Sequence, residues 1–176
     1  RDENKNELEE LLSKGKITEI LETHSSTKER FPIYEKLYKQ IFMATGKPKM
    51  ILDLGCGLNP FSYPFMKLKG LEYHAYDIDS NEIEFIQRYF AILEKRNSSF
   101  KGKAEVKDII NDVLPKVDVC FLLKMTDVID RGKGHKITEN LLEKIPAKYI
   151  VLIFATITMS GKKMTAPRRN WVEWLC

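Results

Sequence analysis

Short apolar runs alternate with helical segments through most of this sequence, and that alternation constrains the fold more than any other feature. The runs cover residues 50–54, 71–76, 103–106, 117–122 and 148–155. Strands that alternate with helices form a parallel sheet through right-handed crossovers, and the helices then cover both faces of that sheet. We therefore predict a doubly wound α/β domain with a mostly parallel sheet.

The segments between the runs have helical signals. Asn59 and Pro60 are residue types that cap and start a helix after the first run. Ser80 is placed to cap a long helix whose apolar side chains recur at spacings of three and four. A further helical pattern covers about residues 135–145.

The first 45 residues contain no strand candidate. Residues 3–22 predict short amphipathic helices. Ser26 and Glu29 have the spacing of a capping box, which predicts that one helix begins there and continues to about Ala44.

We therefore divide the chain into a helical extension, residues 1–45, and an α/β domain, residues 46–176. With 43% apolar and 31% charged residues, the 176-residue chain has the composition of a water-soluble globular protein. No apolar run approaches the roughly 18–20 residues of a membrane span. The three cysteines form neither a disulfide framework nor a zinc pattern. We expect a cytoplasmic monomer that binds neither a membrane nor a metal.

Positive charge gathers in the last third of the chain. Residues 131–170 hold nine basic and two acidic side chains, whereas the whole chain carries only +4. Such asymmetry favours a polyanionic partner, although lysines that only keep a surface soluble would produce it too. The basic residues placed best to hold the phosphates of such a partner follow the last apolar run, at the carboxyl edge of the predicted sheet. They are Lys162, Lys163, Arg168 and Arg169.

A Gly-x-Gly turn, with Gly55 and Gly57, follows the first apolar run. Glycine supplies positive φ angles and lets the backbone approach a ligand closely. Asp53, at the end of the run, suits an ammonium or hydroxyl group and repels a pyrophosphate. The third glycine of a dinucleotide fingerprint and the Gly-Lys-Ser/Thr of a phosphate loop are both absent, which argues against dinucleotides and nucleoside triphosphates.

Carboxylates also follow the next two apolar runs. Asp77 lies 22 residues after Gly55 and can accept both hydroxyls of a ribose. Ile78 can lie against an adenine ring, and Asp108 with Ile109 can read the adenine amino group. Acidic strand ends around a Gly-x-Gly turn fit a positively charged nucleoside without phosphate, namely S-adenosylmethionine. Aspartates that only cap helices would be a less consistent explanation of the whole set.

Four segments have more specific sequences: THSSTKER at 23–30, LGCGLNP at 54–60, LLKM at 122–125 and SGKK at 160–163. Together they resemble the aminoglycoside-resistance 16S ribosomal RNA (guanine-N7) methyltransferases, a family of class I S-adenosylmethionine-dependent methyltransferases. The resemblance extends from about residue 20 to the end. It implies a Rossmann-like fold and methylation of guanine nitrogen 7 in the 16S RNA of the 30S subunit.

The resemblance also implies which residues hold the cofactor. Those around its methionine end would be His24, Ser25, Ser26 and Arg30. The planar donors of Arg30 would bind its carboxylate. Gly55 would approach the methionine and sugar, and Leu123 would close over the cofactor.

Nitrogen 7 of guanine has a free lone pair and no proton, so its attack on a sulfonium methyl group needs no general base. We therefore expect no catalytic side chain and a rate enhancement that comes from positioning. The target base must leave its stack to react. Two alternatives stay open: a methyltransferase acting on a small molecule or protein, and a non-catalytic RNA-binding module with the same fold.

The two ends of the chain differ from the family pattern. The chain starts at Arg1 without a methionine and ends at Cys176, within an aromatic stretch. Family members have a larger helical part before the matching region and a final strand pair after the fifth strand. We therefore expect this chain to be part of a longer protein that lacks both here.

Overall fold

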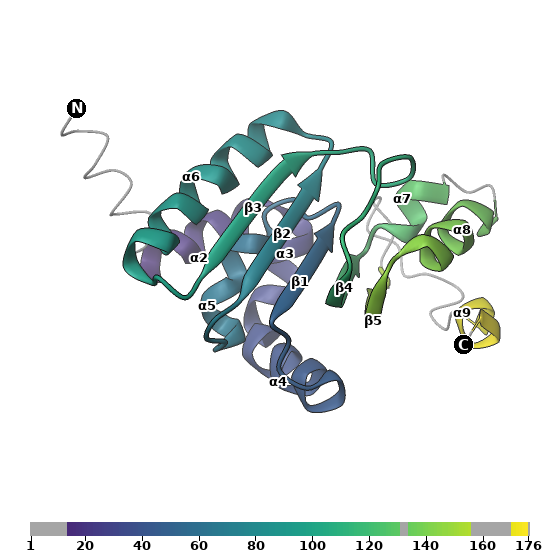
Figure 1. Ribbon diagram of the computed structural model, residues 1–176, viewed down its shortest axis with the longest axis horizontal. Helices are drawn as coiled ribbons and strands as arrows, with labels where there is room; N and C mark the ends of the chain where they lie inside the picture. The colour runs from purple at the N-terminus through teal and green to yellow at the C-terminus, as the bar shows by residue number, and fades with distance from the viewer. Residues whose placement is uncertain (1–13, 131–133, 156–169, 176) are drawn as a thin grey trace.

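The computed structural model describes residues 14–130, 134–155 and 170–175. Its centre is a parallel five-stranded sheet in the order β3-β2-β1-β4-β5 (Figure 1). The strands are β1 (Met50–Leu54), β2 (Glu72–Asp77), β3 (Lys101–Val106), β4 (Val117–Leu123) and β5 (Ala147–Ile153). Each apolar run is thus a strand, and the predicted α/β class is confirmed.

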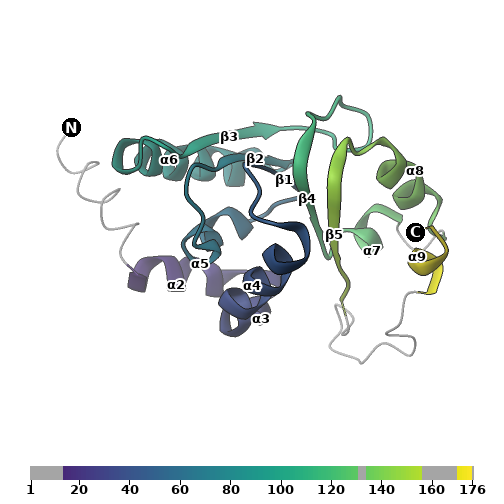
Figure 2. The same ribbon diagram turned by 60° about the horizontal axis from the view of Figure 1, so that its bottom comes forward.

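Helices cover both faces of the sheet (Figure 2). The helices before β4 are α2 (Lys14–Thr23), α3 (Ser25–Arg30), the 3-10 helix η1 (Phe31–Ile33), α4 (Tyr34–Thr45), the 3-10 helix η2 (Asn59–Ser62), α5 (Tyr63–Met66) and α6 (Ser80–Arg96). Those after it are α7 (Thr126–Asp130), α8 (Lys136–Lys144) and α9 (Asn170–Leu175). In the part of the chain that the structure describes, no helix is long and apolar enough to cross a membrane.

The sheet separates two apolar clusters. Ile51 of β1 belongs to the cluster under α2, α4, α5 and α6, whereas Leu52 belongs to the cluster under α7 and α8. Successive strand residues point to opposite faces, and both faces are covered, which explains why the strands are continuous apolar runs. Ile17 of α2 and Tyr38 of α4 share the first cluster with Ile51, so the helices before β1 share a core with the sheet.

The direction of winding reverses beside β1. The chain passes from β1 to β2 and β3 on one side, then crosses to β4 and β5 on the other. A ligand crevice forms at the carboxyl ends of the strands where the winding reverses. The topology therefore predicts a ligand site at the carboxyl ends of β1 and β4.

The single helix predicted from Ser26 to Ala44 is wrong. Three helices, α3, η1 and α4, cover this segment, and Pro32 lies inside η1. Proline has no N–H group and its ring clashes with a continuing helix, so the helix axis changes there. Ser26 caps nothing, because α3 begins after His24, which makes no side-chain cap bond.

Two other predicted caps are also wrong. Asp79, not Ser80, caps α6, since its Oδ1 accepts the N–H groups of Asn81 at 2.9 Å and Glu82 at 3.2 Å. Asn59 makes no cap bond to the short helix η2. Its side chain instead forms buried hydrogen bonds with distant residues, and these bonds organise the site described next.

Candidate cofactor site

Asp53 near the end of β1 is a buried carboxylate, only 1% exposed. Its Oδ2 accepts hydrogen bonds from Asn59 Nδ2 at 2.8 Å and from Tyr73 Oη at 2.7 Å. Burial raises the pKa of Asp53 to about 6, although these two hydrogen bonds and the nearby Arg30 act to lower it. Oδ1 is buried and has no hydrogen-bond partner. The carboxylate therefore keeps one acceptor free.

Arg30, the last residue of α3, is buried on the other side of Asn59. Its Nη2 donates to Asn59 Oδ1 at 3.4 Å, and Tyr34 Oη donates to the same oxygen at 3.1 Å. The guanidinium lies 5.9 Å from the centre of the Tyr34 ring. Its Nε and Nη1 are buried without a partner. Asn59 thus lies between the buried guanidinium of Arg30 and the buried carboxylate of Asp53. Both charged groups have buried atoms without a hydrogen-bond partner.

Buried atoms without a hydrogen-bond partner reduce the free energy of unfolding. A buried polar group without a partner costs about 1–3 kcal/mol, and a charged group more. A ligand with a carboxylate and an ammonium group would satisfy both sides of the cluster. An α-amino acid has that pair of groups.

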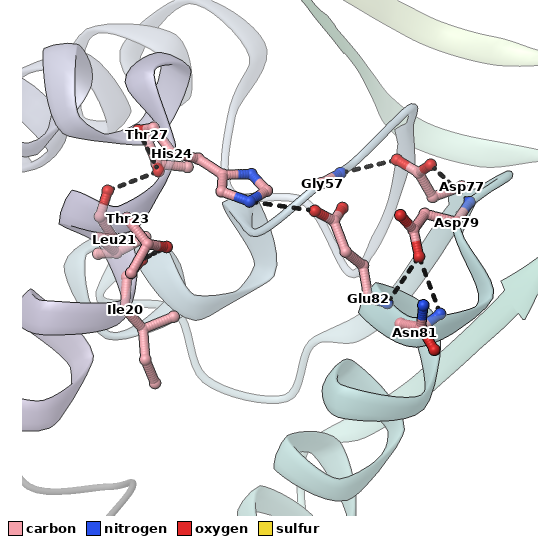
Figure 3. Close-up of polar contacts among 10 residues, drawn as sticks. All are labelled: Ile20, Leu21, Thr23, His24, Thr27, Gly57, Asp77, Asp79, Asn81 and Glu82. Atoms are coloured by element: carbon pink, nitrogen blue, oxygen red, sulfur yellow. Dashed lines mark hydrogen bonds and ion pairs between the residues drawn. The ribbon is translucent and has the colours of Figure 1, made fainter.

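The turn after β1 depends on its glycines. Gly55 has φ +61° and Gly57 has φ +47°, in the left-handed region that favours glycine. Gly57 N donates to Asp77 Oδ2 at 2.9 Å, as Figure 3 shows, and Asp79 N donates to Asp77 Oδ1 at 3.1 Å. Asp77 at the end of β2 therefore holds the turn in place.

An ion pair connects two helices across this turn. His24 before α3 and Glu82 in the first turn of α6 point toward each other, with Nε2 and Oε1 3.3 Å apart (Figure 3). Partial burial raises the pKa of Glu82, and the His24 charge opposes that shift. Glu82 carried no signal in the sequence, because its partner lies far away along the chain.

A cavity of about 410 Å³ runs along the carboxyl edge beside the turn. Five residues predicted to contact the cofactor line it: Gly55, Asp77, Ile78, Asp108 and Ile109. Seven others that were not predicted line it too: Lys107, Ile110, Met125, Val128, Ile129, Asp130 and Ile137. The cavity lining therefore combines three carboxylates with mostly apolar side chains.

Met125 packs directly over the glycine turn. A Cβ built on Gly55 would lie 2.4 Å from Met125 Cε, so any side chain at position 55 would collide with it. A ligand that approaches Gly55 from its Cβ side requires the Met125 side chain to move. The unbranched methionine side chain adapts its shape readily, which makes that movement feasible.

Leu123, which the resemblance placed over the cofactor, belongs to the apolar core. It is 8% exposed, packs in the first apolar cluster and is absent from the cavity lining. Met125, two residues later and beyond the end of β4, lines the cavity instead. Of the LLKM sequence, only Met125 is among the residues that line the cavity.

The other predicted residues have varied positions. Ser25 is exposed, and His24 and Ser26 are half-buried near the start of α3. Neither these residues nor Arg30 and Asp53 are among the residues that line the cavity. The residues predicted to bind RNA lie outside the described part of the chain: Lys162, Lys163, Arg168 and Arg169.

Comparison with known proteins shows similarity to ribosomal RNA methyltransferases. The family described as "Ribosomal RNA methyltransferase (FmrO)" matches residues 12–173. A 16S rRNA (guanine(1405)-N(7))-methyltransferase from Proteus mirabilis is 35% identical over 148 residues, which cover 81% of this chain and 50% of that protein. One with the same name from Frankia casuarinae is 31% identical over 149 residues, 83% of this chain and 50% of that protein. The chain thus spans about half the length of the curated relatives it matches.

Solved structures extend the likeness to three dimensions. The 16S rRNA methylase ArmA superimposes with a TM-score of 0.70 at 28% identity, over 96% of this chain and 84% of that chain. The 16S rRNA methyltransferase RmtF, solved in complex with S-adenosyl-L-homocysteine, superimposes with a TM-score of 0.67 at 22% identity, over 88% of this chain and 56% of that chain. The second likeness concerns the fold alone.

Proposed function

Because the chain belongs to the FmrO family of ribosomal RNA methyltransferases, as the resemblance predicted, we propose that it methylates nitrogen 7 of a guanine in 16S ribosomal RNA. The methyl donor in this proposal is S-adenosylmethionine. The observation that carries the proposal within this chain is that Arg30 and Asp53 have buried atoms without hydrogen-bond partners, while Gly55, two residues after Asp53, lines a cavity with Asp77 and Asp108. That combination fits an amino acid joined to a nucleoside.

The residues present fit each part of this cofactor. Arg30 Nε and Nη1 would bind its carboxylate, and Asp53 Oδ1 would accept from its ammonium group. Asp77 would accept from the ribose hydroxyls, and Asp108 from the adenine amino group. Apolar contacts to the adenine would come from Ile78 and from the other apolar residues of the cavity. The proposal also retains the residues that the resemblance implied: the methionine end of the cofactor would be lined by His24, Ser25 and Ser26. Leu123 would close over the cofactor.

When bound, S-adenosylmethionine supplies a methyl group on a positively charged sulfur. The chain's own contribution is to hold the reacting groups in contact and in line, which lowers the entropic part of the barrier. The guanine lone pair needs no proton removed, so the proposal assigns no general base. The carboxylates of Asp53 and Asp77 favour a cationic ligand at the carboxyl edge.

The proposed substrate is 16S RNA within the 30S subunit. Lys162, Lys163, Arg168 and Arg169 would bind its phosphates, and we propose that the protein acts in the cytoplasm as a monomer without a metal ion. Methylation at this position would make a susceptible bacterium that expresses the complete protein more resistant to aminoglycosides. A higher minimum inhibitory concentration of an aminoglycoside for such a bacterium would support this assignment.

Transfer of a labelled methyl group tests the proposal most simply. The chain is incubated with labelled S-adenosylmethionine and 30S subunits, with protein-free 16S RNA and ribosomal proteins as separate controls. Borohydride and aniline then cleave the RNA at any 7-methylguanine. We expect label in the RNA and one new cleavage site. Label in protein, or labelled RNA that aniline leaves intact, would contradict the proposed reaction.

A further inference from the structure

A second cavity lies away from the cofactor site, between α4 and the segment that follows α5. Its volume is about 740 Å³. Apolar side chains that line it include Phe42, Phe65 and Leu68. The lining also contains four lysines: Lys36, Lys39, Lys47 and Lys67. Figure 1 shows that α4 lies by the start of β1, so this cavity adjoins the amino edge of the sheet.

A smaller depression of about 290 Å³ lies nearby, and Lys47 lines both. It adds Lys49 before β1, Lys148, the second residue of β5, and the half-exposed Tyr149. We call the lysines of the two depressions the lysine band. Its six members are Lys36, Lys39, Lys47, Lys49, Lys67 and Lys148.

The lysine band has more positive charge than its own surroundings neutralise. The carboxylates that line the two depressions are Glu35 and Asp118. Glu35 pairs with Lys67 at 3.2 Å, and Asp118 pairs with Lys148 at 2.6 Å. Four exposed lysines of the band remain without an ion pair among the described residues, which leaves a local excess of positive charge.

From this arrangement we propose that the lysine band binds the phosphate backbone of ribosomal RNA, at a location separate from the target guanine. This inference rests on the proposed function. Exposed lysines that follow a groove hold a polyanion, and exposed aromatic rings beside them offer unpaired bases a surface for stacking. Tyr149 provides such a ring, and the apolar floor around Phe65 offers a second place for a base.

An acidic peptide is the other occupant to consider. A peptide with an apolar face would use the large cavity, whose floor is apolar, but would gain little from the small depression. The small depression is lined by Thr45, Lys47, Pro48, Lys49, Asp118, Lys148 and Tyr149. Because the lysines continue through both depressions, an extended polyanion matches the whole band better.

The position of the band determines which property it controls. The amino and carboxyl ends of β4 are separated by seven residues, which corresponds to on the order of 20 Å. Lys47, Lys49 and Lys148 lie near the starts of β1 and β5, so RNA held by these three residues is far from Asp53 near the carboxyl end of β1. The band would strengthen attachment to the subunit without changing cofactor affinity.

The test compares two double variants of equal charge change. Lys47→Gln/Lys49→Gln removes two members of the band, and Lys95→Gln/Arg96→Gln removes two exposed charges at the end of α6, outside both depressions. At about 0.15 M salt, we expect the first variant to bind 30S subunits roughly 10-fold more weakly than the unaltered chain. The slope of log affinity against log salt should fall in magnitude by about 2.

The control variant should keep both the affinity and the salt slope within about twofold of the unaltered chain. Lys36→Gln/Lys39→Gln, on α4, should weaken 30S binding in the same way as the first variant. Calorimetry with S-adenosylhomocysteine should give equal affinities for every form, and circular dichroism should give equal spectra. Equal 30S affinity for both band variants and the control would overturn the proposal.

Two further arms separate the remaining outcomes. If the band variants lose affinity for 30S subunits but not for protein-free 16S RNA, the band contacts a ribosomal protein and the RNA proposal is wrong. Failure of the proposed function gives a different result, namely no methyl transfer by the unaltered chain while the 30S binding differences persist. The two failures are therefore distinguishable.

Discussion

The two edges of the sheet carry opposite charges and differ in how deeply those charges are buried. At the carboxyl edge, Asp53 is 1% exposed and Asp77 is half-buried, and both are tied into hydrogen bonds around the glycine turn. At the amino edge, the lysine band is exposed and most of its members have no ion pair among the described residues. One scaffold thus offers two different kinds of binding surface.

The difference in burial implies a difference in selectivity. A buried acid with one unused acceptor interacts strongly with a ligand of matching shape, because little water competes there. Exposed lysines interact with any closely spaced phosphates, and salt screens that interaction. The carboxyl edge is therefore suited to one small cation, and the amino edge to a long polyanion.

The largest expected effect comes from removing the buried cation at the carboxyl edge. Arg30→Met should weaken S-adenosylmethionine binding on the order of 100-fold, because hydrogen bonds to charged groups contribute about 1.5–3 kcal/mol each. The exposed Arg88→Met on α6 serves as a control and should change nothing. Calorimetric titration measures both. If Arg30→Met keeps full affinity, the cofactor carboxylate binds elsewhere.

The second-largest loss of cofactor affinity is expected for substitution of Asp77. Asp77→Ala removes a charged acceptor for the ribose and also the partner of Gly57 N, so we expect a loss of about 1.5–3 kcal/mol in binding, roughly 10- to 150-fold. Asp77→Asn keeps one acceptor and should lose less. Equal affinities of Asp77→Ala, Asp77→Asn and the unaltered chain for S-adenosylmethionine would remove Asp77 from the site.

A dependence on pH should follow from the burial of Asp53. Because burial raises its pKa to about 6, Asp53 is ionised at pH 7.5 and mostly neutral at pH 5. A neutral acid attracts the cofactor's ammonium group less, so affinity should fall as the pH falls through 6, by at most tenfold per pH unit. Asp53→Asn should give a weaker affinity that changes little over this interval. Parallel pH profiles for the two proteins would contradict this role.

The smallest effect concerns the acid of the amino edge. Asp118 accepts from the backbone N–H groups of Lys49 and Met50 and pairs with Lys148, and these contacts lower its pKa. Asp118→Ala should reduce the free energy of unfolding by about 1 kcal/mol in urea titrations near pH 7.

Because the folded-state pKa of Asp118 is lowered, its contribution to stability is present above pH 4 and is lost as the pH falls through that lowered pKa. The same variant removes a carboxylate from the lysine band, so affinity for 30S subunits should rise slightly. Unchanged stability would show that Asp118 has no structural role. Weaker 30S binding would conflict with the band's proposed role.

Local patterns in the sequence predicted much of the fold. The strands were identifiable because each is a short apolar run bounded by polar or turn residues, and their ends lie within a few residues of the prediction. The sequence also predicted that the aspartates at the ends of β1 and β2 lie close together, since parallel strands place their carboxyl ends at one edge. Gly55, Asp77 and Asp108 indeed adjoin one cavity.

What the sequence did not reveal depends on contacts between distant residues. Asn59 had the residue type of a helix cap, but two buried charged residues far apart in the sequence determine its hydrogen bonds. Met125 reaches Gly55 only because β4 lies beside β1 in the sheet. The break at Pro32 had a local signal, yet the apolar periodicity on both sides of it suggested one helix.

The structure of this chain with S-adenosylhomocysteine bound tests the central claim most directly. We predict that the ligand lies along the carboxyl edge, with its ribose hydroxyls within 3.2 Å of Asp77, its carboxylate on Arg30 and the Met125 side chain moved off Gly55. A ligand bound at another place, or a carboxyl edge that stays closed by Met125 at saturating ligand, would contradict the account.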